Sequence, residues 1–337
     1  MNFLRKILFP LAFLYWLITY IRNWLYDKGI FKSSSFNIPI IAVGNLSVGG
    51  TGKTPQIEYL IRLLSENYKV AVLSRGYKRT TEGFILADEK ATASSIGDEP
   101  FQFYSKFSNI QVAVDANRKN GIENLLQLSN KPDVILLDDA FQHRKVKAGF
   151  YILLTAFDDL FCDDYILPFG NLREPSSGKK RADMIIVTKC PNDLSEIAQQ
   201  KIREKLKVKQ QVFFTTIQYD DFVFGNDSQL LVSEIQSEGK VLVAGIAKPK
   251  LFFDFLKNET DDTLVFPDHH HFSKQDCEQI LAKANGRKII TTEKDFVRLN
   301  GLLPKEQLFY LSIKSTFLNK NIDKTIEDYV GQSTRNS

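Results

Sequence analysis

The most restrictive stretch of the chain is residues 38–66, where an apolar run, a glycine-rich segment and an amphipathic pattern follow one another. Residues 38–43 are almost entirely apolar, which is typical of a buried parallel strand. From Lys53 onwards, apolar side chains recur at helical spacing as far as Leu64. A glycine-rich loop between a strand and a helix N-terminus is an architecture that binds phosphate groups. The sequence therefore predicts a nucleotide-phosphate site here.

The residue types in this loop suit the phosphate groups of a nucleotide together with Mg²⁺. Lys53 is expected to reach the β- and γ-phosphates, and the Thr54 hydroxyl to ligate Mg²⁺. The usual motif begins with glycine, whereas this chain has Ser47 at that position. An ordinary glycine-rich turn is the alternative interpretation. The predicted nucleotide-binding residues are Ser47, Val48, Gly49, Gly50, Thr51, Gly52, Lys53 and Thr54.

Composition and charge narrow the possible classes of protein. A chain of 337 residues with 43% hydrophobic and 25% charged residues favours two globular domains. The three cysteines lie far apart and form neither a disulfide framework nor a zinc spacing. Residues 1–35 contain five basic residues and one acidic residue, which accounts for the whole net charge of +4. The remaining chain is neutral, so we expect no nucleic-acid partner. The expected oligomeric state is a monomer.

Residues 1–30 form a second informative stretch, rich in apolar and aromatic side chains. The apolar run from Ile7 to Ile21 is shorter than the roughly 20 residues that span a bilayer, and no small-residue cleavage site follows it. A helical wheel gathers the polar residues on one side. This pattern predicts an amphipathic helix that associates with a membrane surface. Packing on the protein's own core and a true membrane span remain alternatives. The polar residues are Asn2, Arg5, Lys6, Thr19, Arg22, Asn23 and Asp27.

Beyond residue 66, short apolar runs alternate with helical patterns, which predicts a parallel sheet covered by helices on both faces. A polar cluster over residues 226–239 marks a seam, after which the alternation restarts. The predicted fold is therefore α/β, a doubly wound parallel sheet of the P-loop NTPase type with a second, smaller α/β lobe. The expected domains are residues 1–30, the membrane-associating helix; residues 31–225, the P-loop core; and residues 226–337, the smaller lobe.

Asp138 and Asp139 follow an apolar run at residues 134–137 and have the form of a Walker B element. In a doubly wound sheet, a carboxylate at the end of a strand can approach the Mg²⁺ that Thr54 ligates. We therefore predict Thr54, Asp138 and Asp139 as metal ligands. Glu99 could add a further carboxylate, or could serve only in the first turn of a helix.

Several rare residue combinations occur together along the chain. Beside the aromatic and basic N-terminus, they lie at residues 44–55, 74–77, 97–100, 138–144, 167–175, 266–270 and 292–295. With these motifs the whole chain resembles the tetraacyldisaccharide 4′-kinase family, the lipid A 4′-kinases of Gram-negative bacteria. One departure is Ala140, where the family often has glycine.

The resemblance implies transfer of the ATP γ-phosphoryl group to the 4′-hydroxyl of a tetraacyldisaccharide 1-phosphate, in the biosynthesis of lipid A (lipopolysaccharide). It also implies a peripheral location at the cytoplasmic face of the inner membrane. With it, we predict Lys53, Asp98 and His269 as catalytic residues. Asp98 would be the base, although a helix N-cap is the alternative for this residue. His269 would orient Asp98 across a cleft between the lobes, with His270 in reserve and His271 structural or solvated.

Other polar residues of these motifs suit the phosphate and hydroxyl groups of such a substrate. The predicted substrate-binding residues are Arg75, Tyr77, Arg118, Gln142, His143, Asn171 and Arg173. The alternative function is a membrane-recruited regulatory P-loop NTPase, and a third possibility is a non-catalytic membrane scaffold. A guanine-specific switch would carry Asn-Lys-x-Asp, of which residues 188–191 retain only the lysine.

Overall fold

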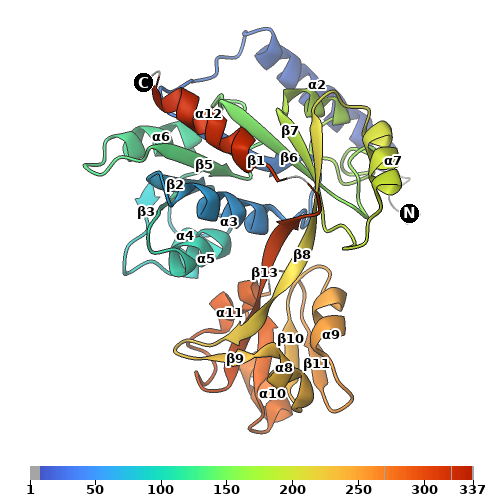
Figure 1. Ribbon diagram of the computed structural model, residues 1–337. Helices are drawn as coiled ribbons and strands as arrows, with labels where there is room; N and C mark the ends of the chain where they lie inside the picture. Colours follow the sequence, from blue (N-terminus) through green and yellow to red (C-terminus); the bar gives the residue numbers. More distant parts are fainter. Residues whose placement is uncertain (1–7, 269, 320, 336–337) are drawn as a thin grey trace.

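The computed structural model describes residues 8–268, 270–319 and 321–335. Figure 1 shows a large lobe and a small lobe connected by the long strands β8 and β13. The strands form one sheet with the order β11-β10-β12-β13-β8-β7-β6-β1-β5-β2-β4-β3, and β9 pairs with β8. The predicted α/β fold with a mostly parallel sheet of the P-loop NTPase type is confirmed.

The large lobe is built around β1, which lies between β5 and β6 and is parallel to both. The β1–β5 register pairs Val43 with Asp138, so the glycine-rich loop after β1 and the carboxylates after β5 meet at one edge. The short β3 runs antiparallel to β4, at the outer edge of the sheet. The strands are β1 (Ile40–Asn45), β2 (Val70–Ser74), β3 (Ile85–Leu86), β4 (Gln111–Val114), β5 (Val134–Asp138), β6 (Phe150–Ala156) and β7 (Met184–Thr188).

Alternate residues of the central strand face different helices, as expected for a sheet covered on both sides. Ile41 and Val43 pack with α3, α5 and α12, whereas Ile40 and Ala42 pack with α6 on the opposite face. Helix α3 buries four aliphatic side chains, each contributing about 2 kcal/mol. The helices are α3 (Lys53–Leu64), α4 (Ala93–Ile96), α5 (Asp98–Lys106), α6 (Arg118–Leu126), the 3₁₀-helix η1 (Ser176–Arg181) and α7 (Glu196–Leu206).

The small lobe is a second α/β layer whose strands β10, β11, β12 and β13 are parallel. Helices cover its two faces with separate apolar clusters. Its elements are β9 (Gln229–Leu231), α8 (Val232–Ser237), β10 (Val241–Ala244), α9 (Lys250–Leu256), β11 (Asp262–Val265), α10 (Lys274–Ala284), β12 (Ile289–Thr292), α11 (Glu293–Leu299) and β13 (Leu308–Phe317).

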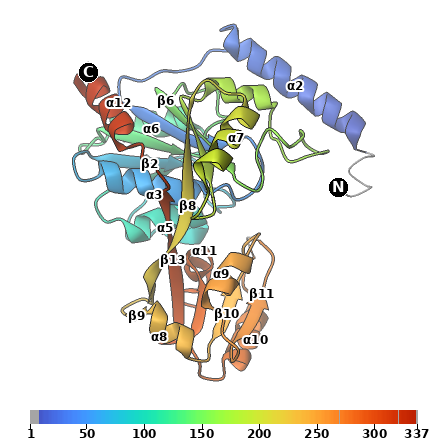
Figure 2. The same ribbon diagram turned by 45° about the vertical axis from the view of Figure 1, so that its right-hand side comes forward.

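The connection between the lobes is an antiparallel ribbon of β8 (Gln211–Phe224) and β13. The first residues of β8 pair with β7 in the large lobe, and its later residues pair with β13. Figure 2 shows both strands crossing from one lobe to the other. Sequence analysis predicted no strand over 211–224. It placed the seam at 226–239, where the structure has β9 and α8.

The last helix, α12 (Asp323–Arg335), returns to the large lobe. Ile322, Ile326 and Val330 are buried in the same cluster as Ile41 and Ile57. Residues after the end of β13 therefore pack with the P-loop core, although they follow the expected boundary at residue 225. The exact domain boundaries remain a proposal. Because of this packing, we propose that α12 belongs to the large lobe.

Helix α2 (Phe9–Asp27) lies along the outside of the large lobe (Figure 2). Its polar side faces the protein, and among its residues only Ala12 and Thr19 are buried. Most of its apolar side chains are exposed, which does not fit the alternative of a helix packed into the core. No helix within the described residues has both the length and the apolar character needed to cross a bilayer. The exposed apolar side chains are Phe9, Leu11, Phe13, Leu14, Trp16, Leu17, Ile18, Tyr20, Ile21 and Trp24.

The packing of α12 predicts the effect of a cavity in its buried face. Ile326→Ala should lower the free energy of unfolding by about 2–5 kcal/mol, because it removes a fully buried side chain from the large-lobe core. Urea unfolding measures the change. The exposed neighbour Thr325 provides the matched control, and Thr325→Ala should change stability by less than about 0.5 kcal/mol. Equal effects of the two substitutions would contradict the packing.

Candidate active site

The glycine-rich loop is supported by the end of β7. Gly52 has a left-handed φ of 79° and caps α3, and Gly49 has a φ of 112°. The Thr188 hydroxyl donates a hydrogen bond to the Thr51 carbonyl oxygen at 2.8 Å, so the last residue of β7 holds the loop. The loop N–H groups and the start of α3 therefore converge at the carboxyl edge of the sheet, where an anion binds favourably.

Lys53 lies among polar groups at this edge. Its Nζ is 3.5 Å from Asn45 Oδ1 and 3.8 Å from Asp139 Oδ1. The Arg173 guanidinium contacts both Asp139 oxygens, at 2.8 and 3.1 Å, and also donates to the Asn45 carbonyl oxygen and side chain. Asn45, Lys53, Asp139 and Arg173 thus form one network at the mouth of the loop.

The two adjacent carboxyl groups have different environments. Burial raises the pKa of Asp138 to about 6, and the nearby charges of Asp139 and Glu99 act in the same direction. The Ser74 hydroxyl donates to Asp138 Oδ2 at 3.1 Å. Burial would also raise the pKa of Asp139, but Lys53 and Arg173 outweigh it and hold that pKa below its usual value. Asp139 is thus paired with cations, whereas Asp138 has one hydroxyl partner.

These residues fit Mg²⁺ bound together with a triphosphate. Mg²⁺ prefers oxygen ligands and is usually held by one or two carboxylates plus phosphate oxygens and water. Asp138 and the Thr54 hydroxyl, in the first turn of α3, supply such oxygens. Throughout the described residues, no group of three or more His, Cys, Asp and Glu side chains could hold a metal alone. The donor set therefore suits a metal that arrives with the nucleotide.

Asp98 and Glu99 begin α5 beside this site. Gly97 precedes them with φ 96° and ψ 157°, a conformation essentially restricted to glycine, and a Cβ there would lie 3.2 Å from Gly76 Cα. Gly97 is the N-cap of α5, so the alternative role of Asp98 as N-cap does not hold. Asp98 Oδ2 instead accepts a hydrogen bond from Arg298 Nε at 2.9 Å. The Glu99 carboxylate is 3.4 Å from Lys294 Nζ.

The histidine run is only partly described. His269, the predicted partner of Asp98, lies outside the described residues. His270 Nε2 lies 3.0 Å from Asp276 Oδ2, and its ring stacks on Phe266 with the centroids 5.0 Å apart. His270 is thereby part of the small lobe's own packing, which disfavours the reserve assignment. His271 is exposed, as expected.

Two of the predicted substrate residues are exposed, whereas Arg118 is buried and His143 is half-buried. Arg75 and Tyr77 are exposed after β2. Arg118 is buried and donates to the Asp115 and Asp138 carbonyl oxygens at 2.9 and 3.0 Å, and burial lowers its pKa to about 10. Burial, followed by the charge of Arg118, lowers the pKa of His143 to about 4. His143 Nε2 is buried without a hydrogen-bond partner among the described residues.

The remaining predicted residues hold neighbouring segments together. Gln142 Nε2 donates to the Asn45 carbonyl oxygen at 2.8 Å and to Glu174 Oε1 at 3.0 Å. The Asn171 carbonyl oxygen accepts from Val48 N at 2.8 Å, which ties the phosphate loop to this segment. Arg173 is occupied by Asp139 and Asn45, as described above. These contacts hold the segments of the site in place. A direct role of Gln142, Asn171 and Arg173 in substrate binding is a proposal.

Sequence reasoning assigned no role to three residues of the site: Asn45, Glu174 and Arg298. Asn45 and Glu174 lie inside motifs that were noted, but no spacing rule indicated that both would be buried beside Arg173 and Gln142. Arg298 lies one turn after residues 292–295 on α11. Only the approach of the two lobes brings it to Asp98.

Helix α2 is tied to the same segments by its polar side. Tyr15 Oη donates to the Arg173 carbonyl oxygen at 2.9 Å, and Arg22 Nη2 donates to the Gln142 carbonyl oxygen at 2.9 Å. Asn23 donates to Glu174 Oε2 at 2.7 Å, and Asp27 forms an ion pair with Arg144 at 2.8 Å. The helix is thus anchored directly behind the Walker B and Arg173 loops, with its apolar side turned outwards.

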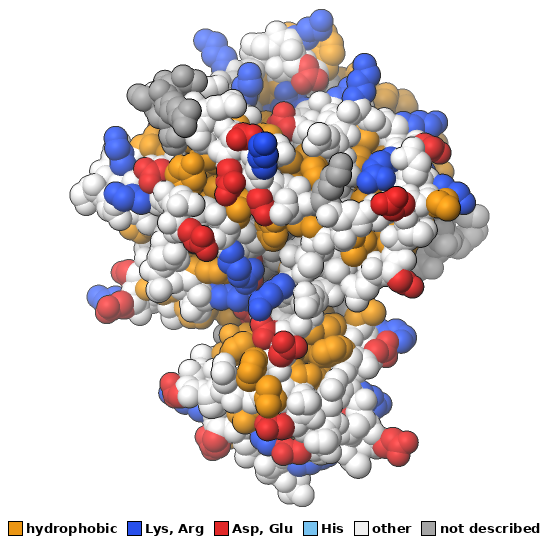
Figure 3. Space-filling model, in the orientation of Figure 1, with side chains coloured by type: hydrophobic (Ala, Val, Ile, Leu, Met, Phe, Trp, Pro, Cys, Tyr) orange, Lys and Arg blue, Asp and Glu red, His pale blue; other side chains and the backbone are white. Residues whose placement is uncertain are grey.

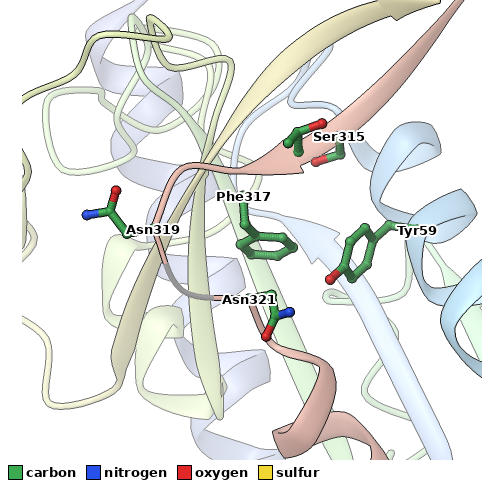
Figure 4. Close-up of a pocket in the computed structure, with 6 residues that line it drawn as sticks. Tyr59, Ser315, Phe317, Asn319 and Asn321 are labelled. Carbon is green, nitrogen blue, oxygen red and sulfur yellow. The ribbon is translucent and has the colours of Figure 1, made fainter.

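A surface pocket lies away from these residues. It is lined by Tyr59 of α3 and by the end of β13 and the segment after it, including Ser315, Phe317, Asn319 and Asn321. Figure 4 shows these side chains beside the point where β13 enters the large lobe. Tyr59 donates a hydrogen bond to Asp323. None of the predicted site residues lines this pocket.

A parallel sheet, a glycine-rich loop with Lys53 at a helix start, and Asp138 after the neighbouring strand define a P-loop nucleotide-binding protein. The sequence profile of the family described as tetraacyldisaccharide-1-P 4′-kinase matches residues 4–330. The chain belongs to this family.

Individual relatives agree with that assignment. The tetraacyldisaccharide 4′-kinase of Flavobacterium johnsoniae is 65% identical over 337 residues, covering 99% of each chain. That of Bacteroides thetaiotaomicron is 45% identical over 362 residues, covering 99% of this chain and 95% of the relative. The crystal structure of LpxK from Aquifex aeolicus in complex with ATP superposes with a TM-score of 0.78 at 30% identity, covering 98% of this chain and 99% of that chain.

The environment of His143 predicts a pH dependence of stability. With a pKa near 4 in the fold and about 6.5 in the unfolded chain, only the unfolded chain binds the proton in this interval. The stability contributed by neutral His143 is therefore present above pH 6.5 and is lost as pH falls towards 4. His143→Asn should reduce the loss of stability between pH 7 and pH 5, measured by urea unfolding. His271→Asn, at an exposed site, should leave that loss unchanged. Parallel pH profiles of wild type and His143→Asn would contradict this.

Proposed function

We propose that this chain is an ATP-dependent kinase that transfers the γ-phosphoryl group to the 4′-hydroxyl of a tetraacyldisaccharide 1-phosphate, in the biosynthesis of lipid A. The observation that supports it most is the family match over residues 4–330, in a chain that retains Lys53 beside the Asp138–Asp139 pair. Such a transfer depends on positioning and charge stabilisation, which this edge of the sheet is built to supply.

In the proposed mechanism, the loop N–H groups from Ser47 to Thr54 bind the phosphates of ATP, and Lys53 lies against the β- and γ-phosphates. The Thr54 hydroxyl and Asp138 would hold Mg²⁺, with Asp139 and Glu99 close enough to contribute. When bound, Mg²⁺ neutralises charge on the phosphate oxygens. Arg173 keeps Asp139 ionised and in place next to Lys53.

The acceptor hydroxyl requires a base. Asp98 is the proposed base, because it begins α5 immediately before Glu99, whose charge acts on Asp138. The sugar oxygen forms a bond to the γ-phosphorus while the bond from that phosphorus to the ADP oxygen breaks. The hydroxyl proton passes to the Asp98 carboxylate. His269 remains the proposed partner that orients Asp98.

We propose that the substrate's sugar and phosphate groups bind near Arg75 and Tyr77 and the polar residues after β5. Arg75 and Tyr77 are exposed, and the charge of Arg75 acts on both Arg118 and His143, so these residues surround one region. In this proposal Arg118, Gln142, His143, Asn171 and Arg173 shape that region and contact the substrate where their existing partners permit.

We also propose that α2 holds the protein at the cytoplasmic face of the inner membrane. Its outward side carries a continuous set of exposed apolar and aromatic residues. Single exposed apolar residues are normal on a protein surface, whereas a contiguous apolar patch marks an interaction surface. Its inward side contacts the Arg173 and Gln142 segments, so a lipid entering from the bilayer would arrive beside the site. The enzyme is proposed to act as a monomer.

The kinase proposal predicts the behaviour of two variants. With ATP, Mg²⁺ and the disaccharide lipid, Lys53→Ala and Asp98→Ala should each reduce phosphate transfer at least about 100-fold, measured with radiolabelled ATP. Lys250→Ala removes an exposed lysine of the small lobe and should retain wild-type activity. Nucleotide turnover by the wild type without any label on the lipid would instead support a regulatory NTPase.

The membrane proposal predicts a loss of vesicle binding when the outward side of α2 is made polar. The triple substitution Phe13→Ser, Ile18→Ser and Ile21→Ser should reduce binding to anionic lipid vesicles at least about tenfold, because it removes apolar contact area. ATP binding should stay unchanged. The matched control makes the same replacement by serine at Ile197, Leu251 and Leu302, which are also exposed but lie outside α2. Equal binding by both triple variants would contradict the proposal.

A further inference from the structure

Helix α11 of the small lobe contacts α5 of the large lobe through three ion pairs. The first joins Arg298 to Asp98, and the second joins Lys294 Nζ to Glu99 at 3.4 Å. In the third, Lys106 lies 2.8 Å from Glu293. Figure 3 shows acidic and basic side chains gathered at the narrow junction of the lobes. Residues 292–298 thus form a docking segment, and this explains a motif to which the sequence assigned no role.

Within this docking segment, Arg298 contacts the proposed base directly. Its side chain is 6% exposed, and Nε and Nη2 both donate to Asp98 Oδ2, at 2.9 and 2.5 Å. Two donors from a planar guanidinium restrict the orientation of a carboxyl group more than a single contact does. Both of these bonds are accepted by the same carboxyl oxygen, Oδ2.

Arg298 is itself held from behind. Its Nη1 donates to Asp295 Oδ1 at 3.3 Å, and Asp295 is completely buried. Asp295 Oδ2 accepts hydrogen bonds from the Gly245 N–H at 2.8 Å and from the Thr292 hydroxyl at 2.7 Å. A continuous chain of hydrogen bonds therefore runs from the end of β10, through Asp295 and Arg298, to Asp98. A side chain can hold another in a defined orientation when its own position is fixed by further hydrogen bonds.

An ion pair that only stabilised the fold would not need the hydrogen bonds that hold Arg298 through Asp295. Exposed ion pairs contribute little to stability, and the small lobe has such pairs, for example Lys250 with Asp254. The Arg298 pair differs because it is nearly buried, crosses between the lobes, and ends on the carboxyl group next to Glu99 and the Asp138 site.

We propose that Arg298 is a positioning residue of the phosphoryl transfer: it orients the Asp98 carboxyl group towards the acceptor hydroxyl whenever α11 is docked on α5. The inference rests on the proposed function, because it takes Asp98 to be the base. It gives the motif at residues 292–295 a role, since Thr292 and Asp295 hold Arg298 while Glu293 and Lys294 fix the docking.

The test compares Arg298→Ala with Arg287→Ala, which removes an arginine of the same lobe from a pair that does not cross to the large lobe. Arg298→Ala should lower kcat for lipid phosphorylation about 100-fold, the scale on which misplaced catalytic groups act, while KM for ATP and ADP binding stay unchanged. Arg287→Ala should keep wild-type kcat. Added guanidinium ion, below concentrations that unfold the protein, should restore part of the kcat of Arg298→Ala.

Further outcomes separate positioning from other roles. In an Asp98→Asn background, Arg298→Ala should cause no additional loss of kcat, because both act through one carboxyl group. An additional loss there, an undiminished or increased kcat in the single variant, or a parallel loss of ADP binding would each overturn the inference. Failure of the proposed function differs from all of these, because wild type itself would then leave the lipid unlabelled.

Discussion

The structure depends on one topological constraint: β1 lies in the middle of a parallel sheet, with β5 on one side and β6 on the other. Because parallel strands end at the same edge, the loop after β1 and the carboxylates after β5 meet there. The charges that result must be compensated. Arg173 and Lys53 do this for Asp139, whereas the half-buried Asp138 carboxyl group accepts a hydrogen bond from the Ser74 hydroxyl and has no ion pair among the described residues. This imbalance leaves a carboxylate suited to a metal that enters with the nucleotide.

The other segments are arranged around that edge. Helix α2 is fastened to the loops carrying Arg173 and Gln142, so the apolar outer surface and the nucleotide site share one support. On the opposite side, α5 presents Asp98 and Glu99 from the large lobe and receives α11 from the small lobe. A helix with an exposed apolar side and a second lobe therefore both contact the segments that carry the proposed chemistry. This is the arrangement that a kinase for a lipid acceptor requires.

Local sequence patterns predicted an element correctly where residues close together in the chain determine its structure. The apolar run before Gly44, the glycines of the loop, and the periodic face of α3 all led to the observed elements, because each is satisfied by neighbours within one strand–loop–helix unit. The position of Asp138 at the end of β5 was predicted in the same way, from the apolar run that precedes it. Where partners are distant, local patterns were insufficient. The strand β8 was not predicted, and Arg173, which was predicted to bind substrate, is paired with Asp139.

By itself, the sequence determined the phosphate loop, the alternating α/β order, the family and the amphipathic character of α2, because these are encoded in residue type and short-range spacing. Only the tertiary structure decided the ribbon of β8 and β13, the return of α12 to the large lobe, and the contact of Arg298 with Asp98. Each of these joins segments far apart in the chain. These contacts form because whole surfaces are buried and their charges are paired. A local sequence pattern does not show which surfaces will meet.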